Sequence, residues 1–497
     1  GARPLAELAS ALSQALLHEG GTHIIHPDTV ARNVAAWVIA DLPAEMVSTL
    51  VQCAIFQGDF TLAAAESVVE LTHLPQAPPV VDLVRRLAGE GLLRVASSLS
   101  GEPRFDMHPL VHDVATERLA TGRDLGTGSA EPLKRALEER HGAYFAQLGY
   151  EEALEALHQR GGWVRRGRYL VDAENLAVAS ERAIARSDAT VAAASALAMC
   201  AVESLAGRQA KAAQRLVAAG SVDGLSPEDR IRCQIAHGEA LVRDRRLDAG
   251  AQILERAASE ARSHGVDRLY ANSLRSLAHH RTAANRWEEA RGLAEQAQQL
   301  SSQHGDRTGH AAALQLLGVC ARATGDLVNA KRLLQQARLT YDQLGEKSME
   351  AVAFVDIAGV HADQGRAGHA MAALDASLTI QRELGDRYGE AEGMGIQGEI
   401  ALDDGQRPRA SELLDAAVGR SRELGAIPLE GRFRGAQAHV QLLSGQHEQA
   451  WDTLTTAERL LAGDGQHGSF ELVFVGCRRV RMEIMANATD AARRNLA

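Results

Sequence analysis

The second half of this sequence repeats itself every 40 residues. Two sets of glycines keep this spacing: Gly305, Gly345, Gly385 and Gly425, and, half a period later, Gly325, Gly365, Gly405 and Gly445. Two further series of small residues stay in register with them: Ala330, Ala370, Ala410 and Ala450, and Gly318, Ala358, Gly398 and Ala438. A fixed period of this length is typical of a solenoid, in which each repeat buries its apolar face only against its neighbours.

Each series has a structural role within a helical hairpin. Gly345 follows the amphipathic run Ala330–Leu344, where a residue with positive φ closes a helix through its last carbonyl groups. Gly325 ends the preceding helix in the same way. Gly318 lies within a helix, where glycine costs about 1 kcal/mol relative to alanine, so we expect another helix to approach closely there. Each period therefore predicts two antiparallel helices.

The register extends towards the N-terminus through Gly238, Gly250, Gly265, Ala278 and Ala290. The sequence thus predicts seven hairpins, with spans of about 188–222, 227–264, 267–304, 307–344, 347–384, 387–424 and 427–463.

An eighth hairpin begins with the apolar run Phe470–Met485 and restarts at Asn487, and the chain stops at Ala497 in the middle of a predicted helix. Natural repeat arrays usually end in a polar capping helix. We therefore expect this chain to be part of a longer protein.

The repeated positions resemble the tetratricopeptide repeat (TPR) family. The residues that match its small and large consensus positions are Leu317, Gly318, Ala321, Ala330, Leu334 and Ala337, and one period later Ile357, Ala358, Ala370, Leu374 and Ser377. The 40-residue period exceeds the usual period of about 34, and Leu384-Gly385-Asp386 stands where the family has a terminal proline. The resemblance implies a mainly all-α fold, with an α-α superhelix of TPR-like repeats whose first helices line a groove.

By the TPR register, nine polar side chains are expected to face that groove: Asn272, Arg275, His279, Gln315, Arg322, Glu392, Glu399, Arg432 and His439. This mixture of charged and polar groups suits a protein or peptide ligand. It does not match the lysine and asparagine clamp that carboxy-terminal chaperone peptides need. For each of these residues, an ordinary exposed side chain is the alternative interpretation.

The first 120 residues lack the repeat and contain the sequence's only predicted strands. Helical segments at about 43–55, 61–71 and 79–90 precede an apolar run at 91–95, a polar turn, a second strand at 104–107 and a helix from Pro109. Helices followed by a small hairpin predict a winged-helix domain at 41–122. We expect a helical segment at 1–40, a helical linker region at 123–187 and the TPR superhelix at 188–497.

The winged-helix segment resembles that of STAND proteins, the signal-transduction ATPases with numerous domains that include the NB-ARC group. The resemblance follows the order of the chain through Ala54–Ala65, Leu83–Leu93 and Arg104–Leu119. Asp172-Ala173-Glu174-Asn175-Leu176 is similar to a segment that often starts the helical region of bacterial members. Arg3-Pro4-Leu5-Ala6 resembles the tail of the Gly-Leu-Pro-Leu-Ala motif that ends the family's nucleotide-binding region.

The resemblance implies roles for two residues. In the family, the histidine of a Met-His-Asp motif contacts the β-phosphate of ADP, and the proline of the upstream motif packs near adenine. By position these residues are His108 and Pro4, although Pro109 replaces the aspartate. An imidazole can donate a hydrogen bond to phosphate. A histidine that only caps or packs at a strand–helix junction is the alternative.

The chain lacks the motif that the chemistry of an ATPase requires. No Gly-x-x-x-x-Gly-Lys-Ser/Thr phosphate loop and no Gly-x-Ser-x-Gly elbow occur in the sequence, so we expect no enzyme activity from this chain. We expect no cofactor in it either; ADP or ATP is implied only for a parent protein with a nucleotide-binding domain. His108 and His112 have the spacing of zinc ligands on a helix, but no third ligand accompanies them, so no metal site is predicted.

Composition narrows the remaining possibilities. No run of about 18 apolar residues occurs, and the N-terminus has no signal peptide pattern, which predicts no membrane partner and a cytoplasmic location. The five cysteines lie far apart and are expected to be buried free thiols. The net charge of −11 argues against general attraction to nucleic acid. The helix Pro109–Leu119 has one basic residue, Arg118, which argues against direct DNA binding.

The leading hypothesis is the regulatory half of a STAND-type signalling ATPase or transcriptional regulator. Its array would bind a protein, peptide or inducer, and its winged helix would relay that event to an NTPase domain outside this chain. A stand-alone TPR scaffold for protein–protein interaction is the alternative. The sequence does not identify the ligand or the process that the protein controls. Transcription, defence and cell death are all compatible with the family.

Overall fold

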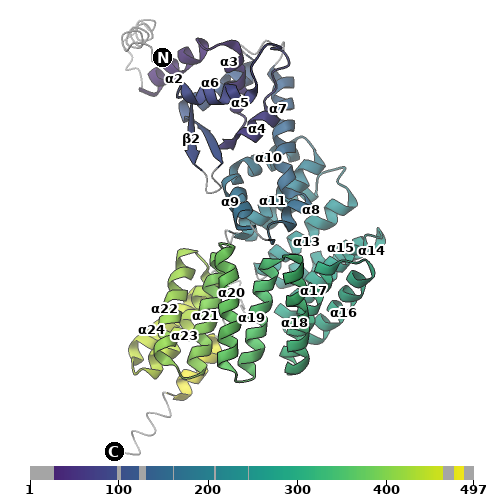
Figure 1. The fold of residues 1–497 in the computed structure, drawn as a ribbon, viewed down its shortest axis with the longest axis vertical. Coiled ribbons are helices and arrows are strands. Elements are labelled where there is room, and N and C mark those ends of the chain that lie inside the picture. The colour runs from purple at the N-terminus through teal and green to yellow at the C-terminus, as the bar shows by residue number, and fades with distance from the viewer. Residues whose placement is uncertain are drawn as a thin grey trace, which may run out of the picture. The chain divides into compact units, whose positions relative to one another are not determined.

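The chain divides into two compact units in the computed structural model, which describes residues 27–97, 102–122, 130–159, 162–205, 209–244, 246–462 and 475–485. Unit 1 comprises Gly1–Tyr150, Gly167–Met199 and Val222–Gly224, and unit 2 comprises Glu151–Arg166, Cys200–Ser221 and Leu225–Ala497. Figure 1 follows the chain from purple to yellow. No helix in the described ranges is both long enough and apolar enough to cross a membrane.

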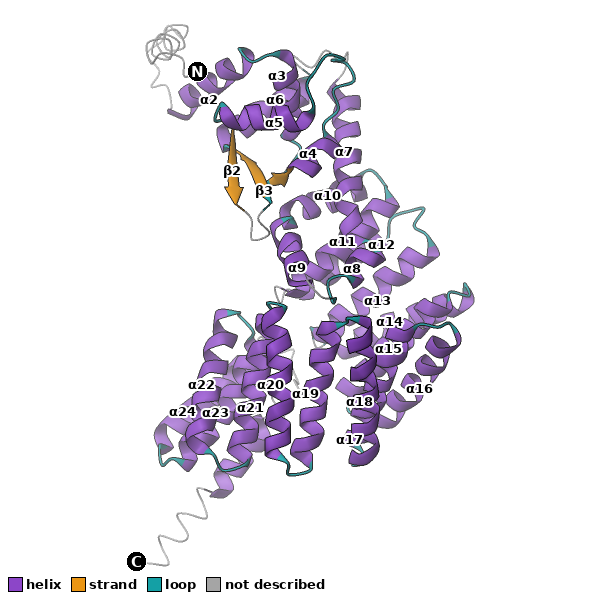
Figure 2. Cartoon of the chain, viewed as in Figure 1, coloured by secondary structure: helices purple, strands orange, loops and turns teal. Residues whose placement is uncertain are grey.

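Unit 1 begins with the expected helices and hairpin. Its first elements are α2 (Pro27–Ala40), α3 (Ala44–Cys53), β1 (Phe60–Thr61), α4 (Leu62–Val68), α5 (Val80–Gly89), β2 (Leu93–Ser97), β3 (Pro103–Met107) and α6 (Pro109–Thr121). The strands form an antiparallel sheet in the order β1-β3-β2, which is orange in Figure 2. The helices and the hairpin confirm the winged-helix prediction.

One short strand was missed by the sequence pattern. Phe60 and Thr61 pair with Phe105 and Arg104 of β3, although residue 61 was expected to begin a helix. Thr61 does both: its backbone belongs to β1, and its side-chain oxygen accepts a hydrogen bond from the Ala64 amide at the start of α4. A threonine that caps a helix has extended backbone angles, so the strand can run directly into the helix.

The rest of unit 1 is helical. It contains α7 (Ala130–Ala146), the 3-10 turn η1 (Gln147–Gly149), part of α9 (Gly162–Val171), α10 (Ala173–Ala185) and most of α11 (Ala189–Leu205). Helix α7 contacts α4, α6 and α10. An aromatic cluster lies beneath these contacts, in which Phe56 stacks on Phe60 at 4.4 Å between ring centroids and His141 lies 4.7 Å from Phe145.

A buried polar network joins the strands to α10 within unit 1. Arg104 on β3 forms ion pairs with Asp59 at 3.0 Å and with Asp172 at 2.5 Å, and Arg104 and Asp172 are each 4 % exposed. The Asn175 side-chain oxygen accepts a hydrogen bond from the Gln57 amide at 2.8 Å, and its nitrogen donates to the Asp59 carbonyl. Residues of the Asp172–Leu176 segment therefore contact winged-helix residues that lie 68 to 118 positions earlier in the sequence.

Unit 2 is the repeat array, with helices close to the expected spans. Its paired helices are α13 (Pro227–Arg243) and α14 (Leu247–Ser263), α15 (Asp267–Ala283) and α16 (Trp287–Gln303), α17 (Arg307–Ala323) and α18 (Leu327–Leu344), α19 (Lys347–Asp363) and α20 (Ala367–Glu383), α21 (Arg387–Asp403) and α22 (Arg407–Glu423), and α23 (Ile427–Leu443) and α24 (His447–Ala462). Helix α12 (Gln209–Gly220) precedes them, and α8 (Glu151–Glu155) also belongs to this unit.

The glycine series has the two roles that its spacing predicted. Gly345 adopts φ +73° as the cap of α18, a conformation that glycine reaches without the strain of a Cβ atom. Gly318 allows a close helix approach, because a Cβ added there would lie 2.7 Å from Leu334 Cγ. The fully buried alanines at Ala330, Ala370, Ala410 and Ala450 extend this small-residue packing.

The hairpins stack in sequence order. Each first helix from α13 to α23 packs against its own second helix, and each second helix packs against the next first helix. After α24, a helix at 475–485 continues the stack, because Val475 and Met482 are buried in one apolar cluster with Ala438 and Leu454. This helix lies within the expected eighth repeat; residues 463–474 and 486–497 of that repeat lie outside the described residues.

Candidate functional site

Most neighbouring first helices of the hairpins contact one another directly. Besides the contacts within and between hairpins, α13 contacts α15, α15 contacts α17, α17 contacts α19, and α21 contacts α23. We call this surface the first-helix wall; its helices are α13, α15, α17, α19, α21 and α23. In a helical solenoid, a surface built from one helix of each repeat gives an extended face for ligands.

A chain of three polar side chains crosses the wall at its middle. The hydroxyl of Tyr341 on α18 donates to Gln315 Oε1 on α17 at 3.0 Å, and Gln315 Nε2 donates to Asp356 Oδ2 on α19 at 2.7 Å. Tyr341 is fully buried, whereas Gln315 and Asp356 are half-buried. Both ends of the Gln315 amide are used, so its orientation is fixed, and Asp356 Oδ1 has no hydrogen-bond partner among the described residues.

The surroundings of Asp356 disfavour its charged form. Burial raises the pKa of this carboxyl to about 6, and the nearby Glu392 adds to the shift, while the hydrogen bond from Gln315 and the charge of Arg322 oppose it. A carboxylate that is ionised at neutral pH but poorly satisfied has a strong affinity for a further donor. An ammonium group, a guanidinium or a peptide N–H would supply one.

A second polar tie joins α17 to α19 beside this cluster. The Arg322 guanidinium donates to both carboxylate oxygens of Asp363, at 2.6 and 3.2 Å. Gly359 makes room for it, because a Cβ at that position would lie 2.1 Å from Arg322 Nη1. The pair is 38 % and 40 % exposed, so a ligand on the wall would meet it.

Further along the wall, three candidates serve the packing of the array. Glu399 forms ion pairs with Arg432 at 2.6 Å and with Arg478 of the 475–485 helix at 2.9 Å. Burial would raise the pKa of Glu399, but the two arginines outweigh it and lower that pKa. His439 is 1 % exposed, and neither of its ring nitrogens has a partner among the described residues. Burial and the nearby Arg478 and Arg481 lower its pKa to about 4.

The remaining expected groove residues lie on α15 and α21. Asn272 accepts a hydrogen bond from Arg275 within α15, and His279 is exposed two turns after Asn272. Arg275 is near enough to Tyr341 for its charge to affect that hydroxyl. Glu392 on α21 lies near Asp356. The structure thus places Gln315, Arg322 and Glu392 near the Asp356 carboxylate, which the sequence interpretation did not include, and Arg275 near Tyr341.

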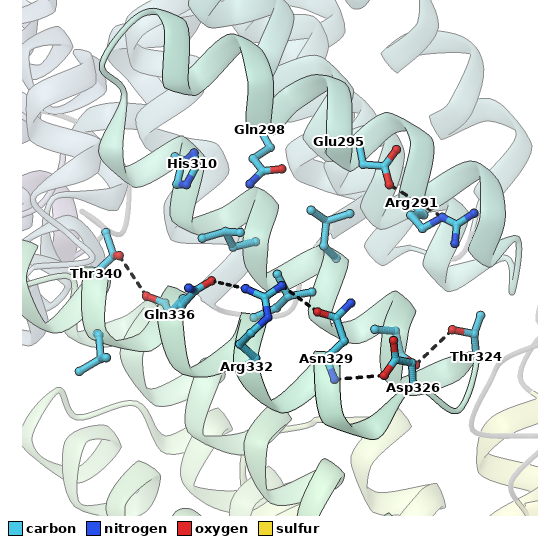
Figure 3. Close-up of a pocket in the computed structure, with 15 residues that line it drawn as sticks. Arg291, Glu295, Gln298, His310, Thr324, Asp326, Asn329, Arg332, Gln336 and Thr340 are labelled. Carbon is cyan, nitrogen blue, oxygen red and sulfur yellow. Dashed lines mark hydrogen bonds and ion pairs between the residues drawn. The ribbon is translucent and has the colours of Figure 1, made fainter.

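A pocket opens on the opposite face of α17. Its volume is about 650 Å³, and Figure 3 shows its side chains converging from α16, α17 and α18. On α17 its lining residues are His310, Leu314, Leu317 and Ala321. At about 100° per residue, these lie on the side of α17 away from Gln315 and Arg322.

One residue that lines the pocket, Ala321, has a larger counterpart in the preceding repeat. One period earlier this position is Arg281, which pairs with Glu255 at 2.7 Å and with Glu289 at 3.4 Å. On the pocket rim, Arg332 donates to Asn329 and Gln336 of its own helix. These two hydrogen bonds hold the Arg332 guanidinium within α18.

The candidate nucleotide-sensing residues fall partly outside the described residues. Pro4 lies there, as does the rest of the segment 1–26. His108 is the exposed N-cap of α6, and its Nδ1 accepts from the Leu110 amide at 3.3 Å. His112 Nε2 lies 3.3 Å from the Phe56 carbonyl. The described residues hold no group of three or more potential metal ligands.

The expected buried cysteines and the basic residue of α6 can be located in the structure. Cys53, Cys200, Cys233 and Cys320 are buried and free, and burial raises the pKa of Cys53 to about 12, whereas Cys477 is exposed. Arg118 of α6 is 9 % exposed and donates to the Ala36 carbonyl at 2.8 Å. Arg118 therefore serves a contact within the protein.

Comparisons with known proteins find likeness in structure only. No protein-family model matches the chain, and no curated protein sequence matches it. A STAND protein with a TPR sensor from Pyrococcus horikoshii is 13 % identical with a TM-score of 0.45, over 91 % of this chain and 68 % of that one. Aspartyl phosphate phosphatase F from Bacillus subtilis is 10 % identical with a TM-score of 0.44, over 90 % and 98 %. The quorum sensor NprR from B. thuringiensis is 12 % identical with a TM-score of 0.42, over 76 % and 93 %. Likeness at this level carries no information on function.

Proposed function

We propose that this chain is the sensor and relay part of a STAND-type regulator. The array binds a protein or peptide segment on the first-helix wall, between α15 and α19. The winged helix then passes the event to a nucleotide-binding domain outside this chain, and the chain itself has no catalytic role. The sequence resemblance over Ala54–Leu119 supports the family, and the wall supports the binding role.

The observation that carries the binding role is the environment of Asp356. A half-buried carboxylate with a raised pKa costs stability, and the apolar packing of α19 does not require it. Gln315 and Tyr341 hold it in place, and one oxygen remains open to a donor. A ligand with a basic side chain or a free amine would provide the missing hydrogen bond while its backbone lies along the polar wall.

The relay role is supported by the way unit 1 is built. The buried Arg104–Asp172 pair and the Asn175 hydrogen bonds make the winged helix and α10 one body. His108 remains exposed, and since its Nδ1 is an acceptor, its Nε2 carries the proton and is free to donate to a phosphate. A nucleotide on a docked domain would then be sensed through this histidine.

The binding role is tested by selecting peptides on the wild-type chain from a phage-displayed library of short random sequences. We expect enriched peptides to carry a lysine, an arginine or a free amino terminus. By calorimetric titration, Asp356→Asn should weaken their binding about tenfold, because a charge-assisted hydrogen bond becomes neutral.

Leu339→Glu is the matched control, since Leu339 is exposed at the rim of the pocket on the other face of α17. It should leave the affinity within about twofold of the wild-type value, well below the 1.4 kcal/mol of a tenfold change. If Leu339→Glu weakened binding and Asp356→Asn did not, the peptide would bind at the pocket and not on the first-helix wall. No enrichment over a blank surface would contradict the binding role itself.

A further inference from the structure

A short segment of the chain leaves unit 1, joins unit 2 and returns. Residues 151–166 belong to unit 2, although the residues up to Tyr150 and those from Gly167 belong to unit 1. We call this segment the strap; its described residues are 151–159 and 162–166. It contains α8 and the first turn of α9. Both of its ends are therefore covalently continuous with unit 1, while its contacts with the array are non-covalent.

One end of the strap is held at the start of α15. Arg268, in the first turn of that helix, forms ion pairs with Glu151 and, at 3.7 Å, with Glu155. All three side chains are at least a third exposed. Ion pairs of this exposure are worth at most about 1 kcal/mol each, so this attachment is weak.

The other end is held at the start of α19. The Ser348 amide donates to the His158 carbonyl at 3.2 Å, and Arg166 donates to Ser348 Oγ at 2.8 Å. The Gln159 side-chain nitrogen lies 3.5 Å from a carboxylate oxygen of Glu346. The amides of the first turn of a helix have no partner within the helix, so the His158 carbonyl satisfies a donor of α19 that would otherwise need water.

The two attachment points are separated by two repeats. Arg268 and Ser348 are 80 residues apart, twice the 40-residue period, and α17 begins between them. The strap therefore spans the rim of the three first helices that carry the central part of the wall. The ties between α17 and α19, Gln315 to Asp356 and Arg322 to Asp363, set the spacing of two of these three helices.

The contact also contains repulsion. Burial raises the pKa of Glu155, and the neighbouring carboxylates Glu346, Asp306 and Glu152 raise it further. Burial likewise raises the pKa of Glu346, against the hydrogen bond from Gln159. These carboxylates repel one another, and few hydrogen bonds hold the strap to the array. Repulsion of this kind favours separation of the strap from the array when the helices beneath it move.

We propose that the strap is a regulatory contact, which stays on the rim while the wall keeps its spacing and is released when α17 and α19 move apart. Release would free the chain on both sides of the strap, which leads directly into unit 1. That a bound ligand is the natural cause of this release rests on the proposed function. The link between the spacing of α17 and α19 and the attachment of the strap does not depend on it. An opening of this kind needs only a few kcal/mol of difference between two states.

The coupling is tested by hydrogen–deuterium exchange of the whole chain, followed at residues 151–159, without any peptide. Arg322→Glu places a carboxylate opposite Asp363 and should separate α17 from α19. We expect exchange in the strap to rise about tenfold, as for the loss of a local contact. Arg322→Gln, which removes the ion pair without adding repulsion, should give a smaller rise.

Two control variants fix the interpretation. Arg268→Ala should raise exchange in the strap directly, because it removes the attachment at α15. Arg332→Glu changes an arginine that bonds only within α18 and should leave the strap unchanged. Wild-type exchange in the strap of Arg322→Glu or of Arg268→Ala would overturn the proposal. Because no peptide is present, this result is independent of whether the wall binds one.

Discussion

The two units are stabilised in opposite ways. Unit 1 depends on contacts that occur once, such as Arg104 with Asp59 and Asp172, and they link residues far apart in the sequence. Unit 2 depends on one contact made repeatedly: a small residue in a first helix packs under a leucine of its partner, as Gly318 does under Leu334 and Gly398 under Leu414. The first arrangement fixes a single body, whereas the second spreads stability along a row of similar interfaces.

This difference has a consequence for function. In unit 2, repeated apolar packing carries the fold, so polar residues on the first-helix wall are free to vary from repeat to repeat. Asp356 occupies a position where the neighbouring repeats have Leu316 and Ile396. In unit 1, buried polar residues such as Arg104 and Asn175 make the contacts that hold the fold together. We therefore expect polar substitutions to reduce stability most in the buried network of unit 1 and to change binding most around Asp356 in unit 2.

The largest effect is expected from Arg104→Met. This change removes the ion-pair partner of Asp59 and leaves the buried Asp172 with only the more distant Arg168, at 3.6 Å. Breaking a buried ion pair in this way costs about 3–5 kcal/mol. Thermal unfolding followed by circular dichroism should show an early transition for unit 1, while the array keeps its own transition. A single unchanged transition would mean that the network does not stabilise unit 1.

Arg94→Met is the matched control for this prediction. Arg94 lies on the neighbouring strand β2 and pairs with Asp106 at 2.5 Å, but its side chain is 59 % exposed. An exposed pair contributes about 0–1 kcal/mol. If Arg94→Met cost as much as Arg104→Met, burial would not be the reason for the loss.

A smaller effect is expected from glycine substitutions in the array. In Gly398→Ala the new Cβ would lie 2.7 Å from Leu414 Cγ, and such overpacking costs about 1–3 kcal/mol. Gly419→Ala in α22 meets no atom within 4 Å and should stabilise by up to about 1 kcal/mol through helix propensity. Denaturant midpoints of the two variants should move in opposite directions. A shift of the same sign would show that close packing at Gly398 is not the governing factor.

The smallest effect, and one of opposite sign to the first, is expected from Asp356→Asn. The pKa of this carboxyl rises from 3.8 to about 6 on folding, so the folded state binds more protons and loses stability as pH rises through that window. The amide escapes this loss and still accepts a hydrogen bond from Gln315. We expect the variant to melt about 1–3 °C higher at pH 7.5 and no higher at pH 4. If the difference in melting temperature between Asp356→Asn and the wild type did not depend on pH, the raised pKa of Asp356 would be contradicted.

The array could be predicted from the sequence because the residues that mark its helix ends and close contacts act locally and recur in every repeat. Gly345 and its equivalents mark helix ends, and Gly318 marks a close approach, whatever the rest of the chain does. The helix boundaries consequently agree with the expected hairpins. In unit 1 the β2–β3 hairpin was also predicted from local residues. Strand β1 was missed, because two residues are too few to show the alternation of apolar and polar residues that marks a strand.

The candidate site was less accessible to this reasoning. Gln315, Arg322 and Glu392 lie near Asp356, because helix register decides which face a residue occupies. Their role in binding a ligand stays a prediction. Asp356 and Asp363 share that face, four and eleven positions after Val352, but lay outside the register positions considered. Glu399 and His439 occupy predicted groove positions but are buried, and Glu399 pairs with Arg478 of the helix at 475–485. That contact depends on tertiary structure and not on the repeat.

The most direct test of the account is a hydrogen-exchange footprint of a library-selected peptide on the whole chain. We predict slower exchange in α17 and α19 around Gln315 and Asp356, faster exchange in the strap at residues 151–159, and little change in α7 and α10 of unit 1. Protection confined to α16 and α18, with α19 and the strap unchanged, would contradict the account, since the ligand would then occupy the pocket on the other face of the array.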